Sequence, residues 1–214
     1  MSSESSIEKF GAWTLRVRPG HGKQILLLLH GWTGDENSMS VLMRGIPDKY
    51  WLLAPRGVYT ASPSGYSWQT PVSPGSRSSI ESYRNSVESL LGFLDLWKTE
   101  NELNIATVDI MGFSQGGALA FSIGALKPDR VNKVIILSGF APKGIEEYLQ
   151  PEIFLGKEFF VAHGAKDEIV PISKAFEIVN YLKGTGAELV FCQSDSGHKV
   201  SASCFNSLLQ FINK

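Results

Sequence analysis

The chain has 214 residues, of which 43% are hydrophobic and 19% charged, and its formal net charge at pH 7 is -1. This composition is typical of one compact globular domain and excludes a chain that is mainly disordered. The near-neutral charge provides no general basic field, so we expect neither nucleic acid nor an anionic bilayer as a partner. The first six residues lack a basic stretch followed by an apolar core, and the longest aliphatic run, 25–29, is too short to cross a bilayer. We therefore expect no integral membrane association.

The two cysteines, Cys192 and Cys204, show no C-x-x-C spacing. They are too few for a disulfide scaffold or a cysteine-rich zinc site, so we predict reduced thiols that pack as small hydrophobic side chains. Reduced thiols favour a reducing compartment. Together with the N-terminal sequence, they predict a cytoplasmic protein.

The predicted elements alternate along the chain. We expect residues 1–6 to form a disordered tail ahead of a single domain over 7–214. Large apolar and polar residues alternate over 13–17, which predicts a half-buried antiparallel strand, whereas the continuous apolar run 25–29 predicts a strand buried on both faces. Similar short apolar segments predict strands at 51–54, 107–111, 133–137, 159–162 and 188–191. Amphipathic or Gly-bounded stretches predict helices at 38–44, 80–97, 115–126, 173–182 and 199–211.

This alternation indicates an α/β fold with a mainly parallel sheet between helices, because parallel neighbours need crossover connections. The N-terminal strand is then expected at one edge. Residues 55–79 are rich in Pro, Gly and Ser and surround Trp68. A loop of this length in a compact domain is more often functional than idle.

The strongest local motif is Gly-Phe-Ser-Gln-Gly-Gly at 112–117, a G-x-S-x-G sequence between the strand 107–111 and the helix 115–126. A sharp turn from strand to helix crowds the neighbouring backbone, and Gly112 and Gly116 let it pass. The motif predicts a nucleophile elbow that exposes Ser114 at the carboxyl edge of the sheet. The alternative is an ordinary glycine-tolerant turn with an N-cap serine.

A serine nucleophile needs a general base, and the base needs a carboxylate that fixes its tautomer. His198 follows the last predicted strand, where functional loops of a parallel sheet gather, and we predict it as the base. For His30 and His163, which end strands in His-Gly pairs, packing under a loop with hydrogen bonds to the backbone is the favoured interpretation.

The predicted acid is Asp167, which follows a buried strand and lies between Ser114 and His198 in chain order, as this type of site requires. Glu168, its neighbour, and Asp195, on the loop of His198, are the alternatives. Asp109 lies within the strand before the elbow and is interpreted as a capping or edge residue.

Acyl transfer also needs donors for a developing oxyanion, and two backbone amides can supply them. We predict the amides of Gln115, directly after the nucleophile, and Trp32, in the Gly-rich loop 30–35. Thr33 is the alternative to Trp32. The aromatic residues Trp32, Trp68, Phe113 and Phe140 are candidate walls of the acyl site, with packing in the core as the competing interpretation.

These motifs resemble the α/β-hydrolase superfamily and, within it, the phospholipase/carboxylesterase family, which includes acyl-protein thioesterases and small bacterial carboxylesterases. The resemblance covers nearly the whole chain and lies in Leu-His-Gly at 29–31 with Gly-Asp at 34–35, the 112–117 motif, His-Gly at 163–164 with Asp167 and Val-Pro at 170–171, and Gly-His at 197–198. It implies a triad of Ser114, Asp167 and His198, with the amides of Gln115 and Trp32 as the oxyanion hole. The family commonly has His-Gly-x-Gly-Asp, and this chain has one more residue before Gly34. The span 139–157 leaves no room for a cap domain.

We therefore expect a serine hydrolase that cleaves short- to medium-chain carboxylic esters through an acyl-enzyme, with a small-molecule ester as substrate and neither a metal nor an organic cofactor. Acyl-protein thioesterase and lysophospholipase are alternatives with the same triad, because the acyl half makes similar demands on the site. A non-catalytic ligand-binding protein with a hydrolase fold is a further alternative. The sequence leaves open a homodimer that covers apolar surface near the site.

Overall fold

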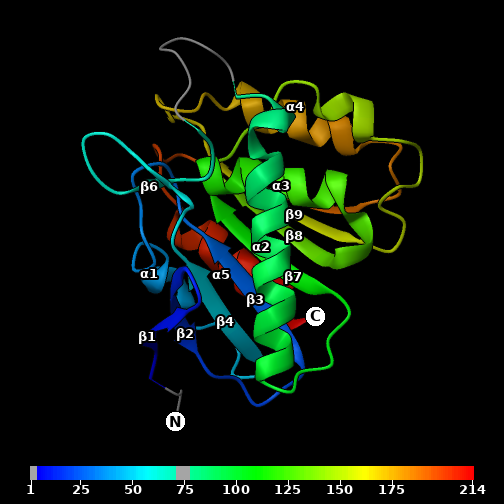
Figure 1. Ribbon diagram of the computed structural model, residues 1–214. Coiled ribbons are helices and arrows are strands. Elements are labelled where there is room, and N and C mark those ends of the chain that lie inside the picture. The colour runs from blue at the N-terminus through cyan, green and yellow to red at the C-terminus, as the bar shows by residue number, and fades with distance from the viewer. Residues whose placement is uncertain (1–3, 71–77) are drawn as a thin grey trace.

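The protein is built around a twisted eight-stranded sheet (Figure 1), seen in a computed structural model that describes residues 4–70 and 78–214. Its strand order is β1-β2-β4-β3-β7-β8-β9-β10. The strands are Ser6–Phe10 (β1), Trp13–Arg18 (β2), Gln24–Leu29 (β3), Tyr50–Pro55 (β4), Val108–Phe113 (β7), Val131–Leu137 (β8), Glu158–Gly164 (β9) and Glu188–Ser194 (β10). The helices are Ser40–Met43 (α1), Ile80–Glu100 (α2), Gln115–Leu126 (α3), Ser173–Leu182 (α4) and Ala202–Asn213 (α5), with 3-10 turns at Pro128–Arg130 and Ile145–Tyr148.

From β4 to β10 all neighbouring strands are parallel, whereas β1 and β2 pair antiparallel with each other and β2 pairs antiparallel with β4. The prediction of an α/β fold with a mainly parallel sheet is therefore confirmed. The edge itself is β1, which the sequence did not predict. Ser6 is already paired in this strand, and Arg16 donates a hydrogen bond to the Ser5 hydroxyl at 3.0 Å. The strand therefore begins at the last residue of the expected tail, and residues 1–3 of that tail lie outside the described residues.

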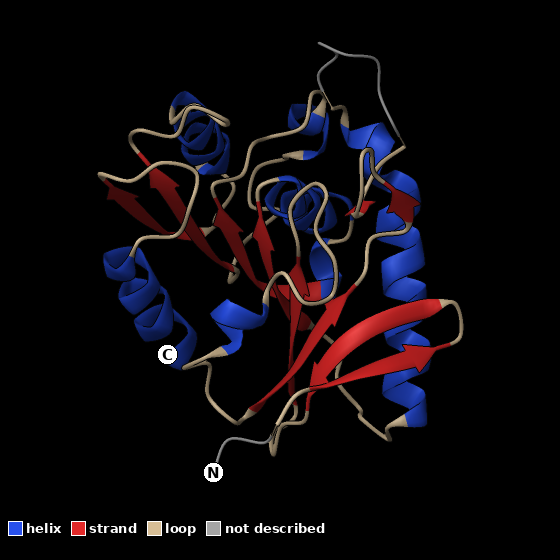
Figure 2. Ribbon diagram, turned by 90° about the vertical axis from the view of Figure 1, so that its left-hand side faces the viewer, coloured by secondary structure: helices blue, strands red, loops and turns tan. Residues whose placement is uncertain are grey.

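Helices cover both faces of the sheet (Figure 2). The side chains of β3 alternate between two apolar cores, with Ile25 and Leu27 in one and Leu26 and Leu28 in the other. The first core also contains the buried faces of α2, α3 and α4, and the second contains those of α1 and α5. Burial on both faces explains why β3 is a continuous apolar run.

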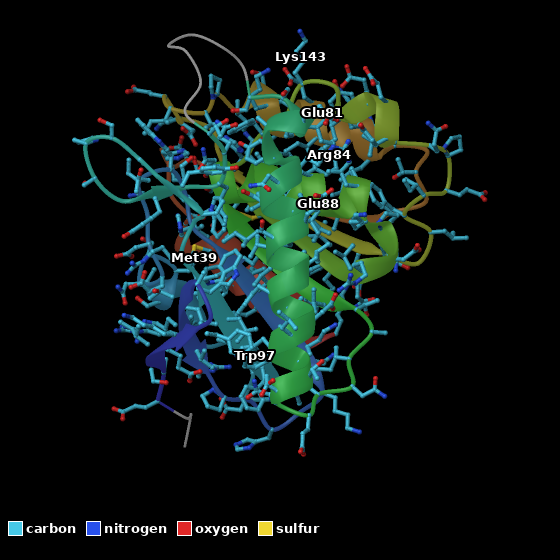
Figure 3. The ribbon with its side chains drawn as sticks, viewed as in Figure 1. Met39, Glu81, Arg84, Glu88, Trp97 and Lys143 are labelled. Carbon is cyan, nitrogen blue, oxygen red and sulfur yellow. A yellow bond between two sulfur atoms is a disulfide. The ribbon has the colours of Figure 1, made fainter. Side chains whose placement is uncertain are left out.

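The long helix α2 is fixed at its N-terminus. The Ser79 hydroxyl caps the helix by accepting a hydrogen bond from the Ser82 amide, and a β-bridge joins Ser79 to Lys143. Figure 3 shows Lys143 near Glu81 and Arg84 at this end of α2. The segment after β8 is thereby held beside the start of the helix.

The prediction that Cys192 and Cys204 are reduced is wrong, because a disulfide joins them. Cys192 lies on β10 and Cys204 on α5, and packing of this helix against the strand brings their Cα atoms to 5.7 Å. Such tertiary proximity leaves no spacing motif in the sequence. The cytoplasmic location therefore loses its argument from reduced thiols and stays a prediction.

The predicted functional loop 55–79 contains a small ribbon, Tyr59–Thr60 (β5) and Tyr66–Ser67 (β6), and its residues 71–77 lie outside the described residues. The ribbon folds back over the loop after β3, since Gly34 forms an antiparallel bridge with Tyr66. No helix in the described ranges is long and apolar enough to cross a membrane.

Candidate active site

The site lies where the strand order of the sheet reverses. The chain passes from β3 to β4 on one side and then crosses back to β7 on the other, with Leu29 of β3 opposite Gly112 of β7. The loops after β3 and β7 lead to opposite faces of the sheet, to α1 and α3 respectively. In open parallel sheets, ligands bind in the crevice that forms at such a point.

Ser114 forms a strained turn between β7 and α3, with φ 54° and ψ -115°. This conformation is rare for a residue with a side chain and is found mainly where surrounding structure enforces it. A Cβ atom on Gly112 would lie 2.0 Å from the Gly116 carbonyl oxygen, and one on Gly116 would lie 2.2 Å from the Leu29 carbonyl oxygen. Both glycines are thus sterically required, as the elbow motif predicts.

The loop after β3 packs directly against this turn. A Cβ atom on Gly31 would lie 3.4 Å from the Ser114 Cβ atom and 3.3 Å from the Phe113 ring. Within the described ranges, the Ser114 hydroxyl makes no hydrogen bond. The space around this hydroxyl is therefore bounded by the elbow and the glycine-containing loop.

His198 and Asp167 form the pair that the sequence predicts. Nδ1 of His198 donates to Oδ2 of Asp167 at 2.7 Å, and the Asp167 side chain is fully buried whereas that of His198 is 15% exposed. The other carboxylate oxygen accepts hydrogen bonds from the amides of Ile169 and Val170 at 3.0 and 2.9 Å. The His198 ring packs against Phe113, the neighbour of Ser114, with ring centroids 4.9 Å apart. Within the described residues Nε2 of His198 makes no hydrogen bond, so this nitrogen is free to act as a general base.

Two opposing effects act on the pKa of Asp167. Burial raises the pKa, but the hydrogen bond from His198 and those from the two backbone amides outweigh it, so the pKa lies below its usual value. The carboxylate is therefore charged at neutral pH and suited to stabilise an imidazolium. The two alternative acids lie elsewhere: Glu168 is exposed, and Asp195 is 75% exposed and pairs with Lys166 at 2.8 Å.

The other two strand-end histidines bond to backbone, as predicted. His30 accepts a hydrogen bond from the Gly57 amide on Nε2 at 2.9 Å, so its Nδ1 carries the proton that reaches the Gly31 carbonyl oxygen at 2.7 Å. Burial lowers the pKa of both His30 and His163. Nε2 of His163 lies 2.8 Å from the Val170 carbonyl oxygen and 3.4 Å from Oδ2 of Asp167. The neutral His163 ring therefore supports the loop that carries Asp167.

Among the amides predicted for the oxyanion hole, the geometry separates Trp32 from Thr33. The Thr33 amide donates to the Tyr66 carbonyl oxygen at 3.0 Å and is thereby occupied. The amides of Trp32 and Gln115 have no acceptor within the described part of the chain. The Gln115 side chain in turn accepts a hydrogen bond from the Trp68 amide at 3.0 Å.

The structure corrects one predicted wall residue. Trp68 is fully buried, donates from Nε1 to the His30 carbonyl oxygen at 2.8 Å and packs against the His30 ring. Trp68 therefore supports the loop after β3 rather than lining a pocket, because its indole N–H binds the His30 carbonyl oxygen, a contact that no sequence pattern predicts. Phe140 lines a separate depression of about 400 Å³ beside α4. Phe113 does line a cavity with His198.

That cavity has a volume of about 490 Å³ and extends from His198 over apolar side chains of the α1 region and the start of α5. These residues carry no local motif and were not predicted from the sequence; they are Met39, Val41, Leu42, Val200 and Phe205. Figure 3 shows Met39 on the side of the molecule that carries α1. A second cavity of about 300 Å³ is lined by Trp32, Gln115 and residues of the 55–79 loop.

Comparison with known proteins yields sequence relatives and similar structures. Acyl-protein thioesterase 1 of Debaryomyces hansenii is 33% identical over 101 residues, which cover 45% of this chain and 42% of that protein. A putative esterase/lipase of Haemophilus influenzae is 26% identical over 144 residues, which cover 67% of this chain and 43% of that protein. In these matches the chain spans less than half the length of either relative.

Two solved structures superimpose over nearly the whole chain. A carboxylesterase from Mesorhizobium loti has a TM-score of 0.83 at 22% identity, with 98% of each chain covered. The Bacillus cereus carboxylesterase has a TM-score of 0.81 at 20% identity, with 92% of each chain covered. At these identities the likeness shows the fold alone. The phospholipase/carboxylesterase family model matches residues 18–214, and the chain therefore belongs to this family and has the α/β-hydrolase fold.

Proposed function

We propose that the protein is a serine carboxylesterase that hydrolyses short- to medium-chain carboxylic esters through an acyl-enzyme intermediate. The observation that carries this proposal is the hydrogen bond from His198 to the buried Asp167, at the same edge of the sheet as the strained Ser114 elbow. Membership of the phospholipase/carboxylesterase family supports it.

In the proposed reaction, Nε2 of His198 takes the proton of the Ser114 hydroxyl as the oxygen attacks the ester carbonyl carbon. The amides of Trp32 and Gln115 stabilise the oxyanion of the tetrahedral intermediate. His198 then donates its proton to the leaving alcohol oxygen, and the C–O bond breaks. A water molecule, activated by the same nitrogen, attacks the acyl-enzyme and releases the acid.

The experiment that tests the proposal is a series of p-nitrophenyl esters from short to long acyl chains, with Ser114→Ala as the control. We expect hydrolysis that is greatest for short to medium chains and that falls by several orders of magnitude in the variant. Unchanged hydrolysis in folded Ser114→Ala would end the proposal.

A second candidate is an acyl-protein thioesterase, favoured by the 33% identity to a relative of that name. A rate maximum at long acyl chains, or faster hydrolysis of a thioester than of the matched oxygen ester, would favour this candidate or a lysophospholipase. A folded protein without activity on any of these substrates would indicate a ligand-binding role.

A further inference from the structure

Two cavities of different character flank the candidate site. The α1/α5 cavity, about 490 Å³, is bordered by His198 and Phe113 and by the apolar side chains of Met39, Val41 and Phe205. The ribbon cavity, about 300 Å³, is bordered by Trp32 and Gln115 and by polar side chains, which are Thr60, Ser62, Ser67, Gln69 and Thr70. His198 borders the first cavity and is absent from the described lining of the second.

The chemistry of ester cleavage determines where the alcohol oxygen of the substrate must lie. When the tetrahedral intermediate collapses, the proton on Nε2 of His198 passes to the alcohol oxygen, the bond between that oxygen and the acyl carbon breaks, and the acyl group stays on the Ser114 oxygen. The alcohol oxygen must therefore lie within hydrogen-bond reach of His198. The acyl oxygen points instead to the amides of Trp32 and Gln115. The alcohol oxygen is therefore expected on the side of the site that His198 and the α1/α5 cavity border.

The lining of this cavity is suited to a hydrocarbon chain. Val41, on α1, is 63% exposed at the border of this cavity, so a branched apolar group faces solvent in the cavity that His198 also lines. Leu42 and Val200 add apolar surface, while Lys199 and the hydroxyls of Ser38 and Ser201 are its polar neighbours. A concave, mostly apolar cavity with a few polar groups at its border is the usual character of a small-molecule binding site.

We propose that the α1/α5 cavity binds the alcohol half of the substrate and selects esters of apolar alcohols over esters of small ones. This inference rests on the proposed esterase function and adds the substrate class to it. The proposed selectivity concerns the alcohol chain of the ester. A substrate series that varies only the acyl chain therefore does not detect this selectivity.

The test measures kcat/KM for methyl, butyl and hexyl acetate by titration of the released acid. Burial of apolar surface predicts an increase of about twofold to fourfold for each added methylene that the cavity covers. Hexyl acetate and ethyl hexanoate are isomers with the same number of carbons, so they separate the two sides of the ester. We expect hexyl acetate to have the higher kcat/KM.

The matched variants are Val41→Ser and Leu155→Ser. Both remove an exposed apolar side chain, but Leu155, 68% exposed, lies outside the described lining of both cavities. We expect the ratio of kcat/KM for hexyl acetate to kcat/KM for methyl acetate to fall at least threefold in Val41→Ser and to stay unchanged in Leu155→Ser.

The outcomes separate the inference from the function on which it rests. A flat response to alcohol length, a preference for ethyl hexanoate, or an equal loss in both variants overturns the inference while the esterase stands. Absence of hydrolysis for every ester, in folded protein, overturns both.

Discussion

Asp167→Asn tests how the carboxylate sets the tautomer of His198. The amides of Ile169 and Val170 hold one side-chain oxygen at 3.0 and 2.9 Å, and the oxygen of an asparagine would take that place. Its amide group then faces Nδ1 of His198, where the carboxylate now accepts a hydrogen bond at 2.7 Å. Two donors cannot face each other, so the imidazole carries its proton on Nε2 and cannot accept the proton of Ser114.

We expect kcat for p-nitrophenyl acetate to fall about 10⁴-fold in Asp167→Asn, which corresponds to about 5 kcal/mol of transition-state stabilisation. Circular dichroism and thermal unfolding of the same preparation check that the variant is folded. A kcat within tenfold of the wild-type value would refute the tautomer argument.

Controls for this prediction are Glu168→Gln and Asp195→Asn, which remove the two neighbouring carboxylates. Both side chains are exposed and Asp195 pairs with Lys166, so we expect kcat to change little in either variant. A collapse of activity in one of these variants, with Asp167→Asn active, would assign the acid to the residue changed in that variant.

Four further predictions concern the framework of the site. Gly112→Ala places a methyl group 2.0 Å from a backbone oxygen of α3 and should lower the free energy of unfolding by about 3 kcal/mol or more, measured in urea; wild-type stability would contradict the close approach. Cys204→Ser removes a disulfide whose cysteines are 12 residues apart and flank the His198 loop, and it should lower the free energy of unfolding by about 3 kcal/mol. An unchanged midpoint of urea unfolding under non-reducing conditions would show that the bond does not constrain the chain. Tyr50→Phe removes the hydroxyl donor that lies 2.7 Å from the buried Asp109 carboxylate and should lower the free energy of unfolding by about 1–3 kcal/mol, measured by calorimetry. Wild-type stability of this variant would contradict the contribution of the hydrogen bond. Folding lowers the pKa of Asp167, so ionisation of this carboxyl group stabilises the protein above the unfolded pKa of about 4. This stabilisation should vanish as the pH falls through the folded pKa. A difference in free energy of unfolding between wild type and Asp167→Asn that grows in favour of wild type in acid would contradict this sign.

The elements that carry the candidate site were predictable because each has a strong local signal. β3 and β7 are apolar runs followed by glycines, and the motif around Ser114 predicts both the strained turn and its close contacts. The order of Asp167 and His198 along the chain predicts their position because successive parallel strands end at one edge of the sheet.

What the sequence did not predict depends on contacts between distant segments. β1 has an exposed burial pattern in which Ser, Glu and Lys alternate weakly with apolar residues, so its periodicity is faint. The partner of Trp68 is a carbonyl oxygen of another loop, and the cysteine pair is formed by packing of α5 on β10. The α1/α5 cavity likewise joins residues from the two ends of the chain, which no local pattern reports.

The most direct test of the central claim is covalent labelling with a fluorophosphonate, read by intact mass and peptide mapping. Because the account assigns an activated nucleophile to the elbow, it predicts one adduct on Ser114, lost in Ser114→Ala and slowed strongly in Asp167→Asn. A folded wild-type protein that stays unlabelled, or that carries the adduct on a different residue, would contradict the account.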